Sequence, residues 1–195
     1  KKNAVVRNLS AVETLGSTSV ICADKTGTLT NNEMTVKEVY VGNEFYEITG
    51  EGYGPKGEIL WPKGDIGPRA KAQIEKTLKA AVLCNNAELK TDSRNRWQVM
   101  GDPTEGALLT AAAKAGLWWQ DLQGSFCRQK ELAFSTQNRT MTVVCQKPTG
   151  EYGVYVKGAP DEVVKYCTSR IDKQDGNPLD LKTRNKILSA NETMA

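Results

Sequence analysis

Histidine is absent from this 195-residue chain, and its five cysteines include no closely spaced pair. A structural zinc site, which needs Cys and His ligands at short spacings, is therefore not expected. An odd number of scattered cysteines also argues against a disulfide framework and predicts reduced thiols, mostly in apolar surroundings. The five residues are Cys22, Cys84, Cys127, Cys145 and Cys167.

Long hydrophobic runs are missing as well. No apolar stretch approaches the roughly 18 residues that span a bilayer, and the chain begins at Lys1 without a secretory signal pattern. We therefore expect a segment of a longer protein that does not itself insert into a membrane. The apolar content of 39% is sufficient for a good core.

Strong charge of either sign is also lacking. The formal net charge is +3, and no cluster of Lys and Arg with interleaved aromatic residues occurs. Nucleic acid is therefore not an expected partner, whereas small anionic ligands suit the mildly basic balance. A P-loop is excluded, because the chain contains no Gly-Lys dipeptide to end one.

The most informative feature that is present is the string DKTGTLT at 24–30, directly after the apolar run VICA at 20–23. The run predicts a buried strand with the Asp24 carboxylate at its C-terminal end, where open α/β sheets place reactive groups. Phosphoryl transfer to a carboxylate needs an ionised acid, a bridging Mg²⁺ ion and donors for the spreading charge. Lys25 and the loop threonines are suitable donors.

Thr26 stands where aspartyl phosphatases of the haloacid dehalogenase type carry a second acid. That acid helps to discharge the phosphorylated intermediate, so a threonine predicts a longer-lived aspartyl phosphate at Asp24. A long-lived phosphoenzyme suits a pump better than a phosphatase. The plain alternative for the string is a solvated turn, which its composition also allows.

The string at 24–30 is the same as the phosphorylation motif of the P-type ATPases, and the chain resembles that family over nearly its whole length. Residues 2–9 and 12–16 are similar to the stretch that leads from the fourth membrane helix into the phosphorylation domain. The resemblance implies a partial α/β phosphorylation-domain segment over 1–32 and a nucleotide-binding domain over 33–195.

Three strings downstream are similar to successive signatures of the nucleotide-binding domain, in the family's order. They are GDPTEGAL at 101–108, FS at 134–135 and KGAP at 157–160. Among the P-type ATPases, the calcium-pump branch and its bacterial relatives are the most similar.

The second part of the chain predicts an α+β fold, an antiparallel sheet flanked by helices. Periodicity and turn signals favour strands over 34–41, 131–134, 140–147 and 152–157. Helices are expected over 68–86, from Asp102 onward, over 160–166 and over 180–191. The stretch 42–68 is expected to be irregular, and its G-x-G-x-x-G match at 52–57 is interpreted as a turn-rich hairpin, because no clear strand precedes it and no helix follows.

The resemblance implies roles for four residues of a nucleotide pocket. In the family, the equivalents of Phe134 stack on adenine and those of Glu105 lie at the adenine edge. Those of Lys157, with the adjacent Gly158, line the pocket. ATP is the implied ligand.

Two further positions depart from the animal calcium pumps. Thr136 stands where those pumps have an arginine, and Arg139 replaces a pocket lysine while keeping its charge, although its guanidinium fork differs from an ammonium group.

For phosphoryl acceptance, the resemblance implies catalytic roles for Asp24, Lys25 and Thr26. Asp24 and Thr26 are also the implied ligands of an incomplete Mg²⁺ site.

Each pocket residue also has a structural interpretation. Glu105 lies three residues after the expected N-cap Asp102, which is the capping-box position, so it can serve only the helix start. Phe134 can belong to the core, and Lys157 can be a solvated strand end.

The resemblance therefore implies the ATP-binding part of an ATP-driven cation pump, with calcium the favoured ion. The rest of the pump is the expected partner, and the cytoplasmic face of a membrane is the expected location. The fragment itself is expected to bind nucleotide without turnover. Two alternatives stay open: a haloacid dehalogenase-like phosphatase with a large cap domain, and a regulatory domain that binds no nucleotide.

Overall fold

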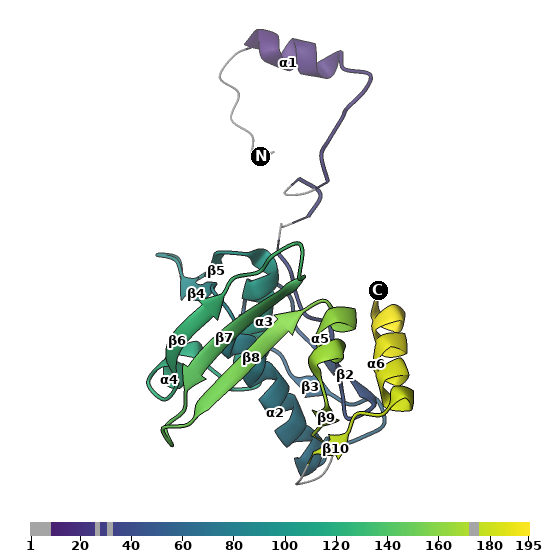
Figure 1. Ribbon diagram of the computed structural model, residues 1–195. Helices are drawn as coiled ribbons and strands as arrows, with labels where there is room; N and C mark the ends of the chain where they lie inside the picture. The colour runs from purple at the N-terminus through teal and green to yellow at the C-terminus, as the bar shows by residue number, and fades with distance from the viewer. Residues whose placement is uncertain (1–8, 26–27, 31–32, 172–175) are drawn as a thin grey trace. The chain divides into compact units, whose positions relative to one another are not determined.

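The computed structural model describes residues 9–25, 28–30, 33–171 and 176–195. The chain divides into two compact units, Lys1–Asn32 and Glu33–Ala195. Figure 1 shows the elements of both units along the chain. We describe each unit by itself.

The first unit contains the helix α1 (Leu9–Gly16), followed by an extended segment. The buried strand predicted over 20–23 is wrong for this structure, because these residues form no strand, and Val20 and Ile21 are 71% and 82% exposed. A strand needs a neighbour for its backbone N–H and C=O groups. No such neighbour pairs with this segment in the described part of the chain.

The second unit combines helices with short antiparallel sheets, which confirms the predicted α+β class. Its helices are α2 (Pro68–Leu83), α3 (Pro103–Lys114), α4 (Trp119–Gln123), α5 (Pro160–Tyr166) and α6 (Leu181–Met194). Among the described residues of this unit, the strands form four sheets. The first contains β1 (Glu38–Val41), β2 (Glu44–Ile48) and β3 (Ile59–Leu60), and the second contains β4 (Glu88–Thr91) and β5 (Trp97–Met100). The third contains β6 (Cys127–Leu132), β7 (Thr140–Gln146) and β8 (Tyr152–Gly158), and the fourth contains β9 (Ser169–Arg170) and β10 (Asn177–Pro178).

The first buried cluster joins α2, α3 and the β1–β2–β3 sheet. Ile74, Leu78 and Val82 recur at helical spacing on one face of α2 and are all buried, as the sequence pattern predicts. They pack with Tyr46 and Ile48 of β2. Burial of this apolar surface is the main force that holds the helices on the sheet.

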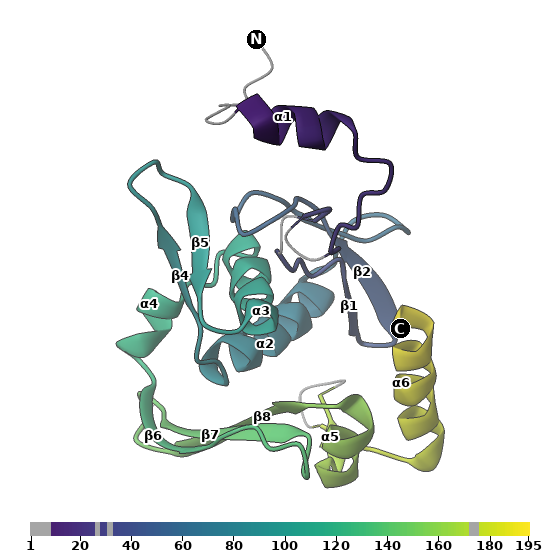
Figure 2. The ribbon, with the colours of Figure 1, turned by 90° about the horizontal axis from the view of Figure 1, so that it is seen from above.

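The second buried cluster lies under the β6–β7–β8 sheet. Met141, Val143 and Cys145 alternate along β7 on its buried face, where they meet Leu83 and Cys84 at the end of α2. Figure 2 shows α2 and α3 on one side of this sheet and no described helix covering the other side.

The five cysteines are free thiols: two are buried, two are exposed, and Cys167 is half-buried. Burial raises the pKa of Cys84 and of Cys145, so both thiols stay protonated at neutral pH. Cys22 and Cys127 are exposed, so the expectation of apolar surroundings is wrong for these two residues.

Several element bounds differ from the prediction. The stretch 42–68 contains β2 and β3, and its first hairpin turns through Gly42 and Asn43, which both have positive φ (64° and 69°). A two-residue Gly-Asn turn of this kind is a hairpin signal that the sequence does offer. The β4–β5 hairpin and α4 were not predicted, and β6 covers Cys127–Leu132 rather than 131–134.

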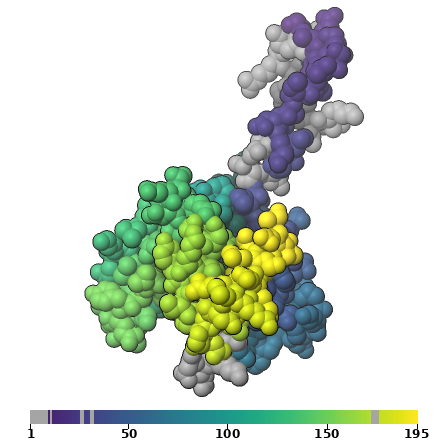
Figure 3. Space-filling view, turned by 45° about the vertical axis from the view of Figure 1, so that its right-hand side comes forward, coloured from purple at the N-terminus to yellow at the C-terminus, as the bar shows by residue number. Residues whose placement is uncertain are grey.

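The C-terminal part follows the prediction more closely. Helix α5 has the bounds that were expected, and α6 begins after the N-cap Asp180, whose Oδ1 accepts from the Thr183 N–H at 2.8 Å. Arg184 of α6 donates to backbone carbonyls of Val164 and Cys167 at the end of α5. Figure 3 shows α6 in yellow beside α5 on the surface.

Candidate nucleotide site

The N-terminus of α3 fixes the position of Glu105. Asp102 is the N-cap, as predicted, and its Oδ1 accepts from the N–H groups of Thr104 (2.8 Å) and Glu105 (3.1 Å). These hydrogen bonds lower the pKa of the Asp102 carboxyl, and the one from the Glu105 N–H has the largest effect. Gly106 then lets α3 lie against β5, because a Cβ at this position would meet Cγ2 of Val99 at 2.3 Å.

The carboxylate of Glu105 has partners in the loop that follows α2 and on β8. Its Oε2 accepts from the backbone N–H of Asn86 at 2.9 Å, and its Oε1 pairs with Nζ of Lys157 on β8. The two paired side chains are only 15% and 23% exposed. Glu105 therefore does more than secure the helix start, and Lys157 is not a solvated strand end.

Phe134 lies at the same end of the sheet as Lys157. In the antiparallel order β6–β7–β8, the end of β6, the start of β7 and the end of β8 share one edge of the sheet, as Figure 1 shows. Phe134 follows β6 in the connection to β7 and is 58% exposed, so it is not a core residue. An exposed ring at this end leaves a flat apolar surface open to solvent.

Arg139 faces a different set of groups. It has a positive φ of 50°, and its guanidinium pairs with Asp161 and, at 2.7 Å, with Glu162 on α5. These two carboxylates raise the pKa of Arg139. The structure therefore brings Glu105 and Lys157 together, while the side chain of Arg139 is engaged by α5.

Gly158 has a structural requirement of its own. A Cβ at this position would lie 2.3 Å from the carbonyl oxygen of Arg139 and 2.8 Å from Cα of Thr140. Only glycine allows this close approach of β8 to the start of β7. Gly158 directly follows Lys157, so this close approach lies at the same end of the sheet as Phe134.

The candidate phosphoryl acceptor Asp24 lies in the first unit and is exposed. Its Oδ1 accepts from the N–H of Lys25 at 2.7 Å, and Leu29 N–H closes a turn onto the Lys25 carbonyl at 3.0 Å. Thr26, the other residue of the predicted Mg²⁺ site, lies outside the described residues. Asp24 supplies a single oxygen-bearing side chain, and no cluster of three or more acids, thiols or imidazoles is gathered anywhere in the described ranges. Mg²⁺ commonly takes one or two carboxylates plus phosphate oxygens, so the residues fit an incomplete site.

Three residues near Glu105 were missed by sequence reasoning. The side chain of Asn86 donates to Glu131 at 2.8 Å, and Arg128 donates to the other oxygen of Glu131 at 2.9 Å. No spacing rule links these positions, because their proximity depends on a bulge in β6 and on where the end of α2 packs against the sheet.

Two hollows of the second unit lie away from these residues. Cavities of about 440 and 240 Å³ are lined, among other residues, by Lys114 and Ile74 and by Trp118 and Leu109, respectively. Neither is lined by Glu105, Phe134 or Lys157. The exposed Phe134 ring leaves this end of the sheet open to solvent.

Comparison with known proteins identifies the family of this chain. The family described as "P-type ATPase, cytoplasmic domain N" matches residues 73–195. The cation-transporting ATPase pma1 of Synechocystis sp. is 40% identical over 176 residues, which are 88% of this chain and 19% of that protein. The calcium-transporting ATPase of Bacillus subtilis is 38% identical over 171 residues, again 88% and 19%. The calcium-transporting ATPase type 2C member 1 of Bos taurus is 37% identical over 196 residues, covering 98% of this chain and 20% of that protein.

The antiparallel sheets, the flanking helices and these matches define a cytoplasmic segment of an ion-transporting ATPase. The chain belongs to the P-type cation-transporting ATPases, with its greater part in cytoplasmic domain N. It spans about a fifth of the length of the curated relatives it matches. Of the helices that the structure describes, none has the length and apolar character of a membrane span.

Proposed function

We propose that this chain is the ATP-binding part of a P-type ATPase that drives cation transport through an aspartyl phosphate at Asp24. The relatives include proteins named calcium-transporting ATPases, and calcium is the ion we favour. In this proposal the rest of the pump is the partner, and the chain acts at the cytoplasmic face of a membrane.

The observation that carries the nucleotide role is the edge of the β6–β7–β8 sheet. There, an exposed Phe134 ring lies at the same end as the Glu105 and Lys157 ion pair. An adenine ring stacks on an aromatic face and offers an exocyclic amine, for which the Glu105 carboxylate is an acceptor. Lys157 and Gly158 border the same end of the sheet, and in this proposal they line the pocket beside the base.

The chemical step belongs to Asp24. A carboxylate oxygen of Asp24 attacks the γ-phosphorus of ATP, the bond to the bridging oxygen breaks, and ADP leaves with the electron pair. Lys25 is adjacent to the carboxylate and offers positive charge to the transferred group. Mg²⁺, when bound, neutralises phosphate charge during this transfer.

Nucleotide binding by the chain alone should be weak. Stacking contributes roughly 1–3 kcal/mol per base, and a charged hydrogen bond about 1.5–3 kcal/mol. Association costs at least about 4 kcal/mol. Because the favourable terms barely exceed this cost, we expect a dissociation constant of millimolar or weaker.

The test is an ATP titration followed by backbone amide resonances. We expect shifts around Glu105, Phe134 and Lys157, with the β4–β5 hairpin tip unchanged. An unperturbed spectrum at several millimolar ATP would refute the proposal and favour a regulatory domain that binds no nucleotide. Arg139 is a further proposed contact, and its resonances would show whether nucleotide phosphate displaces Asp161 and Glu162.

A further inference from the structure

A β-bulge in β6 puts two charged side chains on the same face of the sheet. Arg128 and Glu131 are three residues apart, so in a regular strand they would point to opposite faces. Here Arg128 is opposite Cys145 and Lys130 is opposite Val144, which leaves Gln129 as the extra residue of the bulge.

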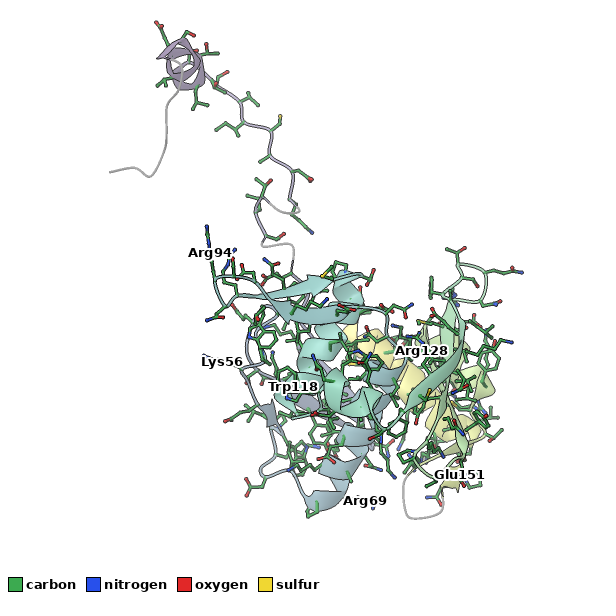
Figure 4. The ribbon with its side chains drawn as sticks, turned by 90° about the vertical axis from the view of Figure 1, so that its left-hand side faces the viewer. Lys56, Arg69, Arg94, Trp118, Arg128 and Glu151 are labelled. Atoms are coloured by element: carbon green, nitrogen blue, oxygen red, sulfur yellow. The ribbon has the colours of Figure 1, made fainter. Side chains whose placement is uncertain are left out.

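The bulge turns both charged side chains toward the helices. Arg128 and Glu131 lie opposite Cys145 and Val143, which are both buried on the α2 side of the sheet. Figure 4 labels Arg128 between the sheet and the helices. Its side chain is 27% exposed, and Lys130 on the same strand is exposed to solvent.

Arg128 and Glu131 hold the segment that follows α2. Nη1 of Arg128 donates to the carbonyl of Asn85 at 3.1 Å, and its Nη2 donates to Glu131 at 2.9 Å. Glu131 in turn accepts from the Asn86 side chain at 2.8 Å. Asn85 is itself buried, and its side-chain amide donates to the backbone carbonyls of Ala81 (3.3 Å) and Glu105 (3.0 Å).

One peptide unit connects this network to Glu105. The carbonyl of Asn85, which accepts from Arg128, and the N–H of Asn86, which donates to Glu105, belong to the same peptide bond. In a trans peptide these groups point in opposite directions. A cation therefore binds one end of the unit and a carboxylate the other, and each hydrogen bond polarises the next.

We propose that Arg128 is a positioning residue for nucleotide recognition, which acts through the peptide unit between Asn85 and Asn86 to hold the Glu105 carboxylate in place. The proposal rests on the proposed function, in which Glu105 accepts from the adenine amine. Glu131 supports it by orienting both Arg128 and the Asn86 side chain.

The experiment compares ATP with ITP, which carries an oxygen in place of the exocyclic amine. Affinities of the 195-residue chain for both nucleotides are measured in wild type, Arg128→Gln and Glu131→Gln. Lys130→Gln is the matched control, because it removes the same charge from the outer face of the same strand. Thermal melting and the Asn86 amide resonance are recorded without nucleotide.

We expect wild type and Lys130→Gln to prefer ATP. Arg128→Gln should lower ATP affinity by roughly tenfold, about 1.4 kcal/mol, leave ITP affinity unchanged and shift the Asn86 amide. Glu131→Gln, the milder variant, should change the preference in the same direction by less. These results would support the positioning role.

Other results distinguish a failure of the positioning role of Arg128 from a failure of the adenine contact of Glu105. If Arg128→Gln keeps the wild-type preference for ATP, or weakens both nucleotides equally, Arg128 does not position Glu105 and the inference is wrong. If wild type shows no preference between ATP and ITP, the adenine contact of Glu105 in the proposed function is itself wrong. Should Arg128→Gln fail to fold, the preference of Glu131→Gln decides in the same way.

Discussion

The two units of this chain differ in what their sequences and structures disclose. Residues 1–32 carry the candidate phosphorylation motif, yet Val20 and Ile21 before it are largely exposed and pair with no strand in the described residues. Unit Glu33–Ala195 carries the other three motifs and contains both buried clusters. A reactive group can thus be encoded in seven residues, whereas the strand that should support it needs neighbours from elsewhere.

The largest effect should come from the acceptor. In the full-length pump, Asp24→Asn should abolish acid-stable phosphate incorporation from labelled ATP, because an amide is a much poorer nucleophile than a carboxylate. Asp65→Asn, on an exposed loop, is the matched control and should label normally. Retained labelling in Asp24→Asn would place the nucleophile elsewhere.

A pair of leucine substitutions should sharpen the contrast in packing. Leu83 is 1% exposed at the second buried cluster, so Leu83→Ala should lower the free energy of unfolding by about 2–5 kcal/mol. The same change at the exposed Leu15 of α1 should alter it by less than about 0.5 kcal/mol. Urea denaturation measures both, and a comparable loss from Leu15→Ala would contradict the division into two units.

The sequence predicts what depends on local pattern. The buried stripe of α2, the Asp102 cap of α3 and the bounds of α5 follow from periodicity and capping, and the structure confirms them. The strand over 20–23 fails because strand formation depends on a partner. The β2 strand, by contrast, was missed although its Gly-Asn turn is visible in the sequence.

The site divides in the same way. Motif resemblance brought Glu105 and Lys157 to attention, and the structure pairs them. It did not indicate that Arg139 would pair with Asp161 and Glu162, because that depends on where α5 packs. The role of Arg128 could not be predicted for a similar reason. A β-bulge decides which face of the sheet its side chain lies on, and no residue pattern in the sequence marks that bulge.

Exposed aromatic residues of the sheet offer a test of binding without folding. Phe134→Ala should weaken ATP binding by about tenfold, in keeping with the worth of a stacked base, and leave the melting temperature unchanged because the ring is exposed. Tyr152→Ala, at the opposite end of β8, is also an exposed aromatic and should change neither quantity. A lower melting temperature of Phe134→Ala with unchanged ATP affinity would show that Phe134 has a structural role only.

The smallest effect concerns pH and the α3 cap. Because hydrogen bonds lower the folded-state pKa of Asp102, its ionised form adds stability above its ordinary pKa of 3.8, and this is lost as the pH falls through the lower folded value. Asp102→Asn keeps an acceptor that does not titrate, so its stability should fall less steeply below about pH 4. Thermal melts across this range measure the slope, and an equal slope in both proteins would exclude Asp102 as a contributor.

We propose that nucleotide recognition resides wholly in residues 33–195 and phosphoryl acceptance in the segment before them. The most direct test is the ATP affinity of residues 33–195 alone, measured beside that of the whole chain by calorimetry or amide shifts. We expect the same affinity for both, with a dissociation constant of millimolar or weaker. Binding that disappears when residues 1–32 are removed would contradict it.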